Sequence, residues 1–271
     1  MGFVINSFRF AVVSTPWDIS NASYDNVSLD VAARDGNPTG VAFSADGTKM
    51  YMVGAFSDSV HQYSLSTAWD LSTASYDSVS FDVSGQDDQP HGLAFSSDGT
   101  KMYVTGVQTD AVYQYSLTAW DLSTASYDSV SLGVSGQDRL PSGLAFSSDG
   151  TKMYIMGGGN KTAYQYSLTA WDLSTASYDS VSFSVEAQDF NHTEVAFSSD
   201  GTKMYMVGGS NDSVHQYSLS TAWDLSTASY DSVLHDVSGQ DVNPQGAAFS
   251  ADGTKMYVVG AGTDTIYQYS V

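Results

Sequence analysis

The sequence predicts an all-β fold, a five-bladed β-propeller in which each blade has four antiparallel strands. The first observation is a tandem repeat: Trp-Asp recurs at residues 17, 69, 120, 171 and 223, with spacings of 52, 51, 51 and 52. The second is the hexapeptide Asp-Gly-Thr-Lys-Met-Tyr, which recurs with the same spacings from Asp46, Asp98, Asp149, Asp200 and Asp252. Radially repeated four-stranded units of about 50 residues are typical of propellers, whereas a linear solenoid would need polar capping repeats.

The second unit shows the strands that each blade should contain. Ser78–Val83 alternates polar and apolar residues, so it is expected on the outside of the blade. Gly92–Ser96 is short and apolar, which favours a strand buried on both faces. The Asp-Gly pair of Ser97–Gly99 predicts a tight hairpin turn, and Lys101–Val104 and Val112–Leu117 supply the other two strands. No segment carries a helical apolar stripe over three turns, so no long helix is expected.

The segment Ala94–Val104 (AFSSDGTKMYV) resembles the inner hairpin of YVTN-type and WD-like propeller repeats. The resemblance extends over all five units and implies a propeller fold. It leaves the function open, because such propellers include binding scaffolds, lectins and enzymes. The copy Trp120–Asp128 is also similar to repeats common in environmental bacterial and phage proteins.

The strand order of these repeats, from inner strand A to outer strand D, implies how the ring closes. The fifth A, B and C strands are expected near 246–250, 255–260 and 265–270, which leaves no residues for a D strand after them. Tyr24–Val31 has the pattern of a D strand with no A, B or C strand before it. We expect it to complete the last blade, a three-plus-one closure joining the termini. Residues 1–271 then form one domain, with 1–16 as a surplus N-terminal strand.

Charge and composition exclude several function classes. The chain has 9 Lys plus Arg against 30 Asp plus Glu, a net charge of −21, and so lacks the basic face that nucleic acids or anionic membranes require. It has no cysteine, which removes disulfides and thiol chemistry. No apolar run approaches 18 residues and no signal peptide is visible, so we expect a soluble monomer. The localisation stays open, with an extracellular or virion-associated setting among the alternatives.

One face of the propeller is expected to vary while the other is copied. Between units 69–119 and 120–170, almost all differences fall at Asp88–His91, before strand A, and at Val104–Val112, around the B-to-C loop. In a propeller these two loops share one face, and the unchanged C-to-D loop lies on the opposite face. The mouth of the central channel on the variable face is therefore where a small-molecule site or a partner surface is expected.

The broken symmetry concentrates in the fourth unit. His192 stands where the other four units have Pro, and Glu194 stands where they have Gly. The only two glutamates, Glu186 and Glu194, flank the same loop. We predict ligand-binding residues on this face and assign no catalytic residue and no metal ligand. The predicted residues are Arg34, Asp88, His91, Arg139, Lys161, Glu186, Phe190, His192 and Glu194.

Carboxylate chemistry competes with a structural explanation of the same residues. Asp88, Asp189 and Glu194 are candidates for the two carboxylates of a glycosidase. An aspartate recurs in the same loop of every unit, at Asp35, Asp87, Asp138, Asp189 and Asp241. A residue repeated in this way is better explained as a turn cap, because Asp hydrogen-bonds its own backbone two residues on.

Metal and sugar binding are two further alternatives. No cofactor is expected, and calcium held at the channel mouth by His91, His192 and the loop aspartates is the alternative. The repeated segment Trp69–Asp77 offers an aromatic ring beside acceptors, as sugar-stacking sites do, so five weak sites would give avidity. The competing explanation is that the Trp packs at the rim of the blade while Asp and Ser cap the connection.

These patterns favour a non-catalytic binding or display scaffold. Its variable D-to-A and B-to-C loops would contact a protein or glycan ligand, and no enzymatic activity is expected. The alternative function is a carbohydrate-binding lectin or a carbohydrate-active enzyme with its site at the channel mouth.

Overall fold

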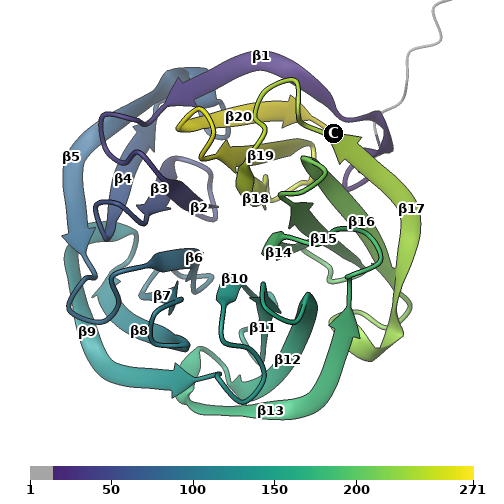
Figure 1. The fold of residues 1–271 in the computed structure, drawn as a ribbon. Helices are drawn as coiled ribbons and strands as arrows, with labels where there is room; N and C mark the ends of the chain where they lie inside the picture. The colour runs from purple at the N-terminus through teal and green to yellow at the C-terminus, as the bar shows by residue number, and fades with distance from the viewer. Residues whose placement is uncertain (1–14) are drawn as a thin grey trace, which may run out of the picture.

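The computed structural model describes residues 15–271, and these form five four-stranded antiparallel sheets arranged in a ring (Figure 1). Each sheet is one blade, with one edge strand at the central axis and the other on the circumference. The predicted all-β, five-bladed propeller is thus confirmed. Among the described residues, no helix is long and apolar enough to cross a membrane.

Each blade contributes one strand to each of four concentric layers. The innermost strands are β2 (Pro38–Phe43), β6 (Pro90–Phe95), β10 (Pro141–Phe146), β14 (His192–Phe197) and β18 (Pro244–Phe249). The second strands are β3 (Lys49–Gly54), β7 (Lys101–Gly106), β11 (Lys152–Gly157), β15 (Lys203–Gly208) and β19 (Lys255–Gly260). The third strands are β4 (Ser59–Leu65), β8 (Ala111–Thr118), β12 (Thr162–Thr169), β16 (Ser213–Leu219) and β20 (Thr265–Ser270). The outermost strands are β5 (Ala74–Asp82), β9 (Asp121–Gly133), β13 (Asp172–Ser184), β17 (Ala228–Asp236) and β1 (Ser23–Asp30).

The blades are numbered 1 to 5 in the chain order of their innermost strands. Short 3-10 turns precede three of the outermost strands. These turns are η1 (Ile19–Asn21), η2 (Leu71–Thr73) and η3 (Leu225–Thr227).

The ring closes in blade 5, where the N-terminal strand β1 pairs with the C-terminal strand β20 (Figure 1). The Asp25 carboxylate on β1 accepts hydrogen bonds from Lys255 at 2.6 Å, Gln268 at 2.8 Å and Ser270 at 2.6 Å. This confirms the three-plus-one closure. The expected surplus strand falls mostly on residues 1–14, which lie outside the described residues.

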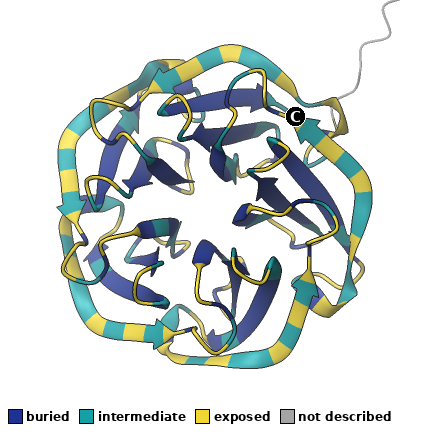
Figure 2. Ribbon diagram, viewed as in Figure 1, coloured by how far each residue is buried: buried dark blue, intermediate teal, exposed yellow. Residues whose placement is uncertain are grey.

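Burial decreases from the axis to the circumference (Figure 2). The three inner strands of each blade are mostly buried, while the outermost strands alternate between exposed and partly buried residues. This is the alternation that predicted an outer strand at Ser78–Val83. The three inner strands are buried because neighbouring blades cover both of their faces.

One buried tyrosine in each blade ties that blade to the next. Its hydroxyl donates a hydrogen bond of 2.5–2.7 Å to the backbone carbonyl of the repeated Trp in the following blade. These tyrosines are Tyr51, Tyr103, Tyr154, Tyr205 and Tyr257. A buried phenol needs such a partner, so the repeated Trp is positioned as part of the blade interface.

The repeated loop aspartates are caps, as predicted. Asp87 accepts the amide of Gln89 at 2.7 Å through Oδ1 and the amide of Thr109 at 2.8 Å through Oδ2. It thereby joins the loop before the innermost strand to the loop after the second strand, and the other four blades repeat these bonds. A Cβ at Gly106 would lie 2.3 Å from Asp87 Oδ2, so only glycine fits there.

Candidate functional site

A small cavity lies where the innermost strands begin, on the face with the variable loops. We call it the mouth cavity, and its volume is about 180 Å³. It is lined by residues from the starts of four innermost strands and from the adjoining loops. The lining residues are His91, Val107, Leu140, Ser142, Gly158, Asn191, His192, Thr193 and Gln245.

The second residue of each innermost strand faces the neighbouring blade. Hydroxyls at this position close the gap between blades: Thr39 donates to the His91 carbonyl at 3.2 Å, and Ser142 donates to the His192 carbonyl at 3.1 Å. In blades 2 and 5 the same position holds the longer side chains of His91 and Gln245, and these two residues line the mouth cavity together with Ser142 and Thr193. The cavity therefore lacks the five-fold symmetry of the fold around it.

His192 is buried without the hydrogen bonds that a buried imidazole normally makes. Its side chain is 1% exposed, and neither Nδ1 nor Nε2 has a partner among the described residues. Burial lowers the pKa of His192 to about 4, although the nearby Asp189 carboxylate acts in the opposite direction. The imidazole is therefore neutral at pH 7, and both of its nitrogens are buried.

His91 presents a second neutral imidazole to the same cavity. Its Nδ1 atom is buried and has no partner among the described residues. Burial lowers the pKa of His91 to about 4, although the residue as a whole keeps part of its surface exposed. Buried polar atoms in native proteins are normally hydrogen-bonded to protein or to ordered water, so this atom is available to a partner of either kind.

Glu194 lies two residues beyond His192 on β14 and joins blade 4 to blade 3. Its Oε1 atom accepts hydrogen bonds from the backbone amide of Leu144 at 3.0 Å and from that of the next residue, Val195, at 2.9 Å. Burial raises the pKa of Glu194 to about 8, despite these two hydrogen bonds, so the carboxyl is protonated at neutral pH. A Cβ at Gly143 would lie 2.7 Å from Oε1, so glycine in blade 3 accommodates the glutamate of blade 4.

Two of the nine predicted ligand-binding residues, His91 and His192, line the mouth cavity. Glu194 lies two residues from His192 on β14 but does not line the cavity, and the other six lie on the same face outside it. Arg34 lies over the Tyr76 ring, with its guanidinium carbon 4.2 Å from the ring centroid, and Lys161 donates to the Gly159 carbonyl at 3.1 Å. Arg34, Asp88, Arg139, Glu186 and Phe190 are exposed.

Sequence reasoning missed Ser142, Asn191, Thr193 and Gln245. Three of these occupy the second position of an innermost strand, which varies between blades and so shows no single departure from a consensus. A usable signal was present nonetheless. This position differs from blade to blade while the following Val/Leu/Ala-Ala-Phe segment is retained, as expected for side chains that face a channel rather than the core.

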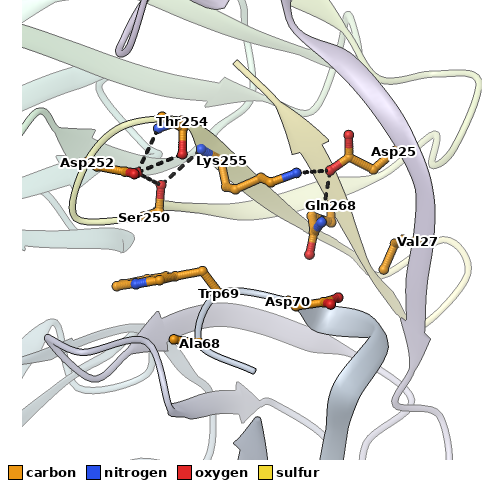
Figure 3. A pocket seen from close by; sticks show the side chains of 10 residues that line it. All are labelled: Asp25, Val27, Ala68, Trp69, Asp70, Ser250, Asp252, Thr254, Lys255 and Gln268. Atoms are coloured by element: carbon orange, nitrogen blue, oxygen red, sulfur yellow. Dashed lines mark hydrogen bonds and ion pairs between the residues drawn. The ribbon is translucent and has the colours of Figure 1, made fainter. Parts of the chain in front are cut away.

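Larger cavities lie on the opposite face, between adjacent blades, and Figure 3 shows one of them. Four were found, with volumes of about 430–550 Å³. In the cavity between blades 5 and 1, Trp69 and Asp70 of blade 1 face Asp252 and Lys255 of blade 5. The same residue types line all four cavities, so this is a repeated feature of the blade interface.

The polar groups of these interblade cavities are bonded to one another. Burial raises the pKa of Asp25, but hydrogen bonds from Gln268, Lys255 and Ser270 outweigh it, so the net pKa is lowered. Asp252 accepts hydrogen bonds from Ser250 and Thr254. The mouth cavity, although smaller, has unpartnered imidazoles and residues that occur once, and it is the better candidate for a reaction centre.

The described residues contain no cluster of ligands for the calcium site that the sequence left as an alternative. Within residues 15–271, no three His, Asp or Glu side chains converge in a way that could hold a metal ion. The loop aspartates instead accept backbone amides, as Asp189 does from Asn191 and Asn211.

A family model described as "Lactonase, 7-bladed beta-propeller" matches residues 31–271. No curated protein sequence matches the chain significantly. The match supports the expected propeller repeats, whereas no comparison confirms the YVTN-type or WD-like naming. It also shows that the family's sequence pattern is compatible with five blades in place of seven.

Several solved structures share the fold at low sequence identity. A protein of Bacteroides uniformis provisionally described as a 6-phosphogluconolactonase is 14% identical with a TM-score of 0.54, covering 85% of this chain and 65% of that protein. This chain thus spans about two thirds of its length. A luciferin-regenerating enzyme is 13% identical with a TM-score of 0.55, covering 90% of this chain and 95% of the enzyme. A protein of unknown function from Desulfotomaculum acetoxidans is 11% identical, with a TM-score of 0.52 and coverages of 82% and 79%.

The family match overturns the functional expectation drawn from the repeats. A non-catalytic binding or display scaffold, without enzymatic activity, is wrong because the matching family is one of lactonases, which are enzymes. The loop variation that suggested a scaffold is real, but it surrounds a cavity with two neutral, unpartnered histidines. The chain belongs to the lactonase seven-bladed β-propeller family.

Proposed function

We propose that the protein is a hydrolase that opens the ring of a lactone at the mouth cavity. Family membership supports the reaction class. The observation that carries the site is the pair of neutral imidazoles, His91 and His192, in a cavity that interrupts the five-fold symmetry. A cavity of about 180 Å³ has room for a small ring and little more.

In this proposal, an imidazole acts as the general base. Lactone hydrolysis begins when water oxygen attacks the ring carbonyl carbon, and the imidazole takes the proton that the water loses. The ring carbon–oxygen bond then breaks, and the same proton passes to the leaving alkoxide, which gives a hydroxy acid. Both imidazoles are neutral at pH 7 because burial lowers their pKa to about 4, so either is able to accept a proton.

The carbonyl oxygen gains negative charge in the transition state and needs donors. Asn191 and Gln245 line the cavity with side-chain amides that can donate. Gln245 Nε2 donates one hydrogen to Asn243 at 2.7 Å, which leaves its second hydrogen available. These amides are uncharged, so they suit a developing oxyanion without requiring a counterion in a strongly acidic protein.

Glu194 is assigned a positioning role. Its hydrogen bond to the Leu144 amide holds β14 against β10, and therefore fixes His192 relative to Ser142. Protonation near neutral pH keeps this link free of buried charge. A charge at this point would disfavour the compact arrangement of the innermost strands.

Hydrolysis of a panel of γ- and δ-lactones, followed by acid release at constant pH, tests the proposal. We expect the wild-type protein to hydrolyse at least one of these lactones. In His192→Asn or His91→Asn, kcat/KM should fall by at least about 100-fold, the usual effect of losing a general base. His235→Asn is the matched control, because His235 lies on the outermost strand β17 and packs on Tyr269. No turnover of any lactone, or equal turnover in all three variants, would reject the proposed site.

A further inference from the structure

Large apolar side chains are exposed around the mouth cavity. Five large apolar residues of the described chain are strongly exposed, and four of them lie on the loops of this face. They are Phe56 at 75%, Leu140 at 47%, Phe190 at 71% and Val242 at 67%. The fifth, Leu234, is 48% exposed and lies on the outermost strand β17. The apolar surface is thus concentrated where the candidate site opens.

One of these residues lines the cavity, and a second is next in the chain to a lining residue. Leu140 lines it, together with the partly buried Val107, and Phe190 immediately precedes the lining residue Asn191. The backbone carbonyls of Leu140 and His192 both lie 3.4 Å from the position of a Cβ on Gly158. Leu140 and Phe190 therefore belong to neighbouring loops at one edge of the opening, and we call the two side chains the apolar edge.

The loops do not require apolar residues at these positions. The position of Leu140 is held by Asn37, Gln89, Asn191 and Asn243 in the other blades, and that of Phe190 by Gly36, Asp88, Arg139 and Val242. The aspartate cap beside them is the same in every blade. Polar side chains satisfy the same loop geometry, so folding alone does not explain an exposed Leu140 and Phe190.

We infer that the substrate is a lactone carrying a linear alkyl or acyl chain, which Leu140 and Phe190 hold at the edge of the mouth cavity. The inference rests on the proposed lactone hydrolysis and adds the substrate class. The cavity volume of about 180 Å³ accommodates the ring but not a long substituent. A chain attached to the ring leaves the cavity over the apolar edge, where it is removed from water.

The chain-length dependence of kcat/KM is the test. Across γ-lactones with alkyl substituents from none to eight carbons, each methylene group that is buried against the edge is expected to raise kcat/KM about fourfold. Leu140→Asn and Phe190→Asp introduce residues already present at these positions in other blades. Both variants should flatten this dependence of kcat/KM on chain length. Leu234→Asn is the matched control for Leu140→Asn, since the two leucines are equally exposed, and it should preserve the series.

Binding of γ-lactams with the same alkyl series, which resist hydrolysis, separates the two proposals. Chain-dependent lactam binding without lactone turnover would reject the reaction and retain the apolar edge. Turnover with no chain dependence, or a preference for hydrophilic sugar lactones that the edge variants do not alter, would overturn the inference. If kcat/KM does not depend on chain length and Phe190→Asp abolishes self-association of the protein, these side chains form a contact between copies and the inference is overturned.

Discussion

The carboxyl group of Glu194 in blade 4 accepts a hydrogen bond from the backbone amide of Leu144 in blade 3, with 3.0 Å between Oε1 and the nitrogen. The other blade junctions have glycine at the position of Glu194. This junction therefore contains a titratable group where the rest of the ring has none. Its pKa of about 8 means that the junction changes charge within an accessible pH range.

The first prediction concerns the pH dependence of stability in Glu194→Gln. The pKa of this carboxyl is raised from 4.5 to about 8 by burial, so between these values the folded state keeps a proton that the unfolded state has lost. The wild-type free energy of unfolding therefore falls as pH rises through this window, by roughly 1.4 kcal/mol per unit of pKa difference. Glutamine cannot ionise, so the variant gains stability relative to wild type from pH 4.5 to 8 and no further above it.

Urea unfolding of both proteins at several pH values measures this difference. Glu186→Gln serves as the control, because Glu186 is exposed and its substitution should leave the pH profile of the wild type intact. A constant difference between Glu194→Gln and wild type from pH 5 to 9 would contradict a buried, protonated Glu194.

The fold was predictable because its determinants are local and repeated. The Asp-Gly pair of the hairpin turn, Asp98 and Gly99 in the second unit, recurs in every unit. The capping aspartate, Asp87 in blade 2, also recurs in every blade, so all five copies predict the same structure. His192 and Glu194 could also be singled out, since they replace a repeated Pro and Gly. The chemistry of these residues could not be predicted, because the protonation and hydrogen bonding of a histidine depend on its burial. The sequence does not distinguish an exposed loop histidine from a buried one without hydrogen-bond partners.

The second prediction is a pH profile for lactone hydrolysis. A general-base imidazole must be neutral, and burial places the pKa of both His91 and His192 at about 4. We therefore expect kcat/KM, corrected for spontaneous hydrolysis, to rise with pH up to about 4 and to stay level through neutrality. Above pH 8 the rate should change again in wild type as Glu194 ionises, and this second change should be absent in Glu194→Gln. A single rise near pH 6.5 would mean that an exposed, ordinary histidine is the base.

The third prediction compares two glycines that have different surroundings. A Cβ at Gly106 would lie 2.3 Å from the Asp87 carboxylate, whereas a Cβ at Gly85 would meet nothing within 4 Å. Gly106→Ala should lower the free energy of unfolding by roughly 1–3 kcal/mol, as overpacking does, because Asp87 must move and lose its amide partners. Gly85→Ala should change it by less than about 0.5 kcal/mol. Thermal unfolding of the two variants checks this, and equal melting temperatures would mean that the cap is not rigid.

The fourth prediction separates the closing strand from an ordinary outermost strand. Asp25 on β1 and Asp179 on β13 each accept hydrogen bonds from a Lys, a Gln and a Ser of their own blade. The distance from the Lys nitrogen to the carboxylate is 2.6 Å for Asp25 and 2.8 Å for Asp179. Replacing either by Ala removes equivalent bonds, so both should lower global stability by a similar amount, roughly 1–3 kcal/mol.

The two variants should nevertheless differ in local opening. The strand β13 directly follows β12 of its own blade in the chain, whereas β1 comes from the other end of the chain and is held to blade 5 by noncovalent contacts, chiefly its pairing with β20 and the bond from Lys255 to Asp25. Weakening that pairing lets β1 detach while blades 1 to 4 stay folded. Amide exchange in residues 23–30 should therefore accelerate in Asp25→Ala well beyond the change in global stability, and exchange in residues 172–184 should follow global stability in Asp179→Ala. Parallel acceleration in both would mean that the closing strand unfolds only with the whole ring.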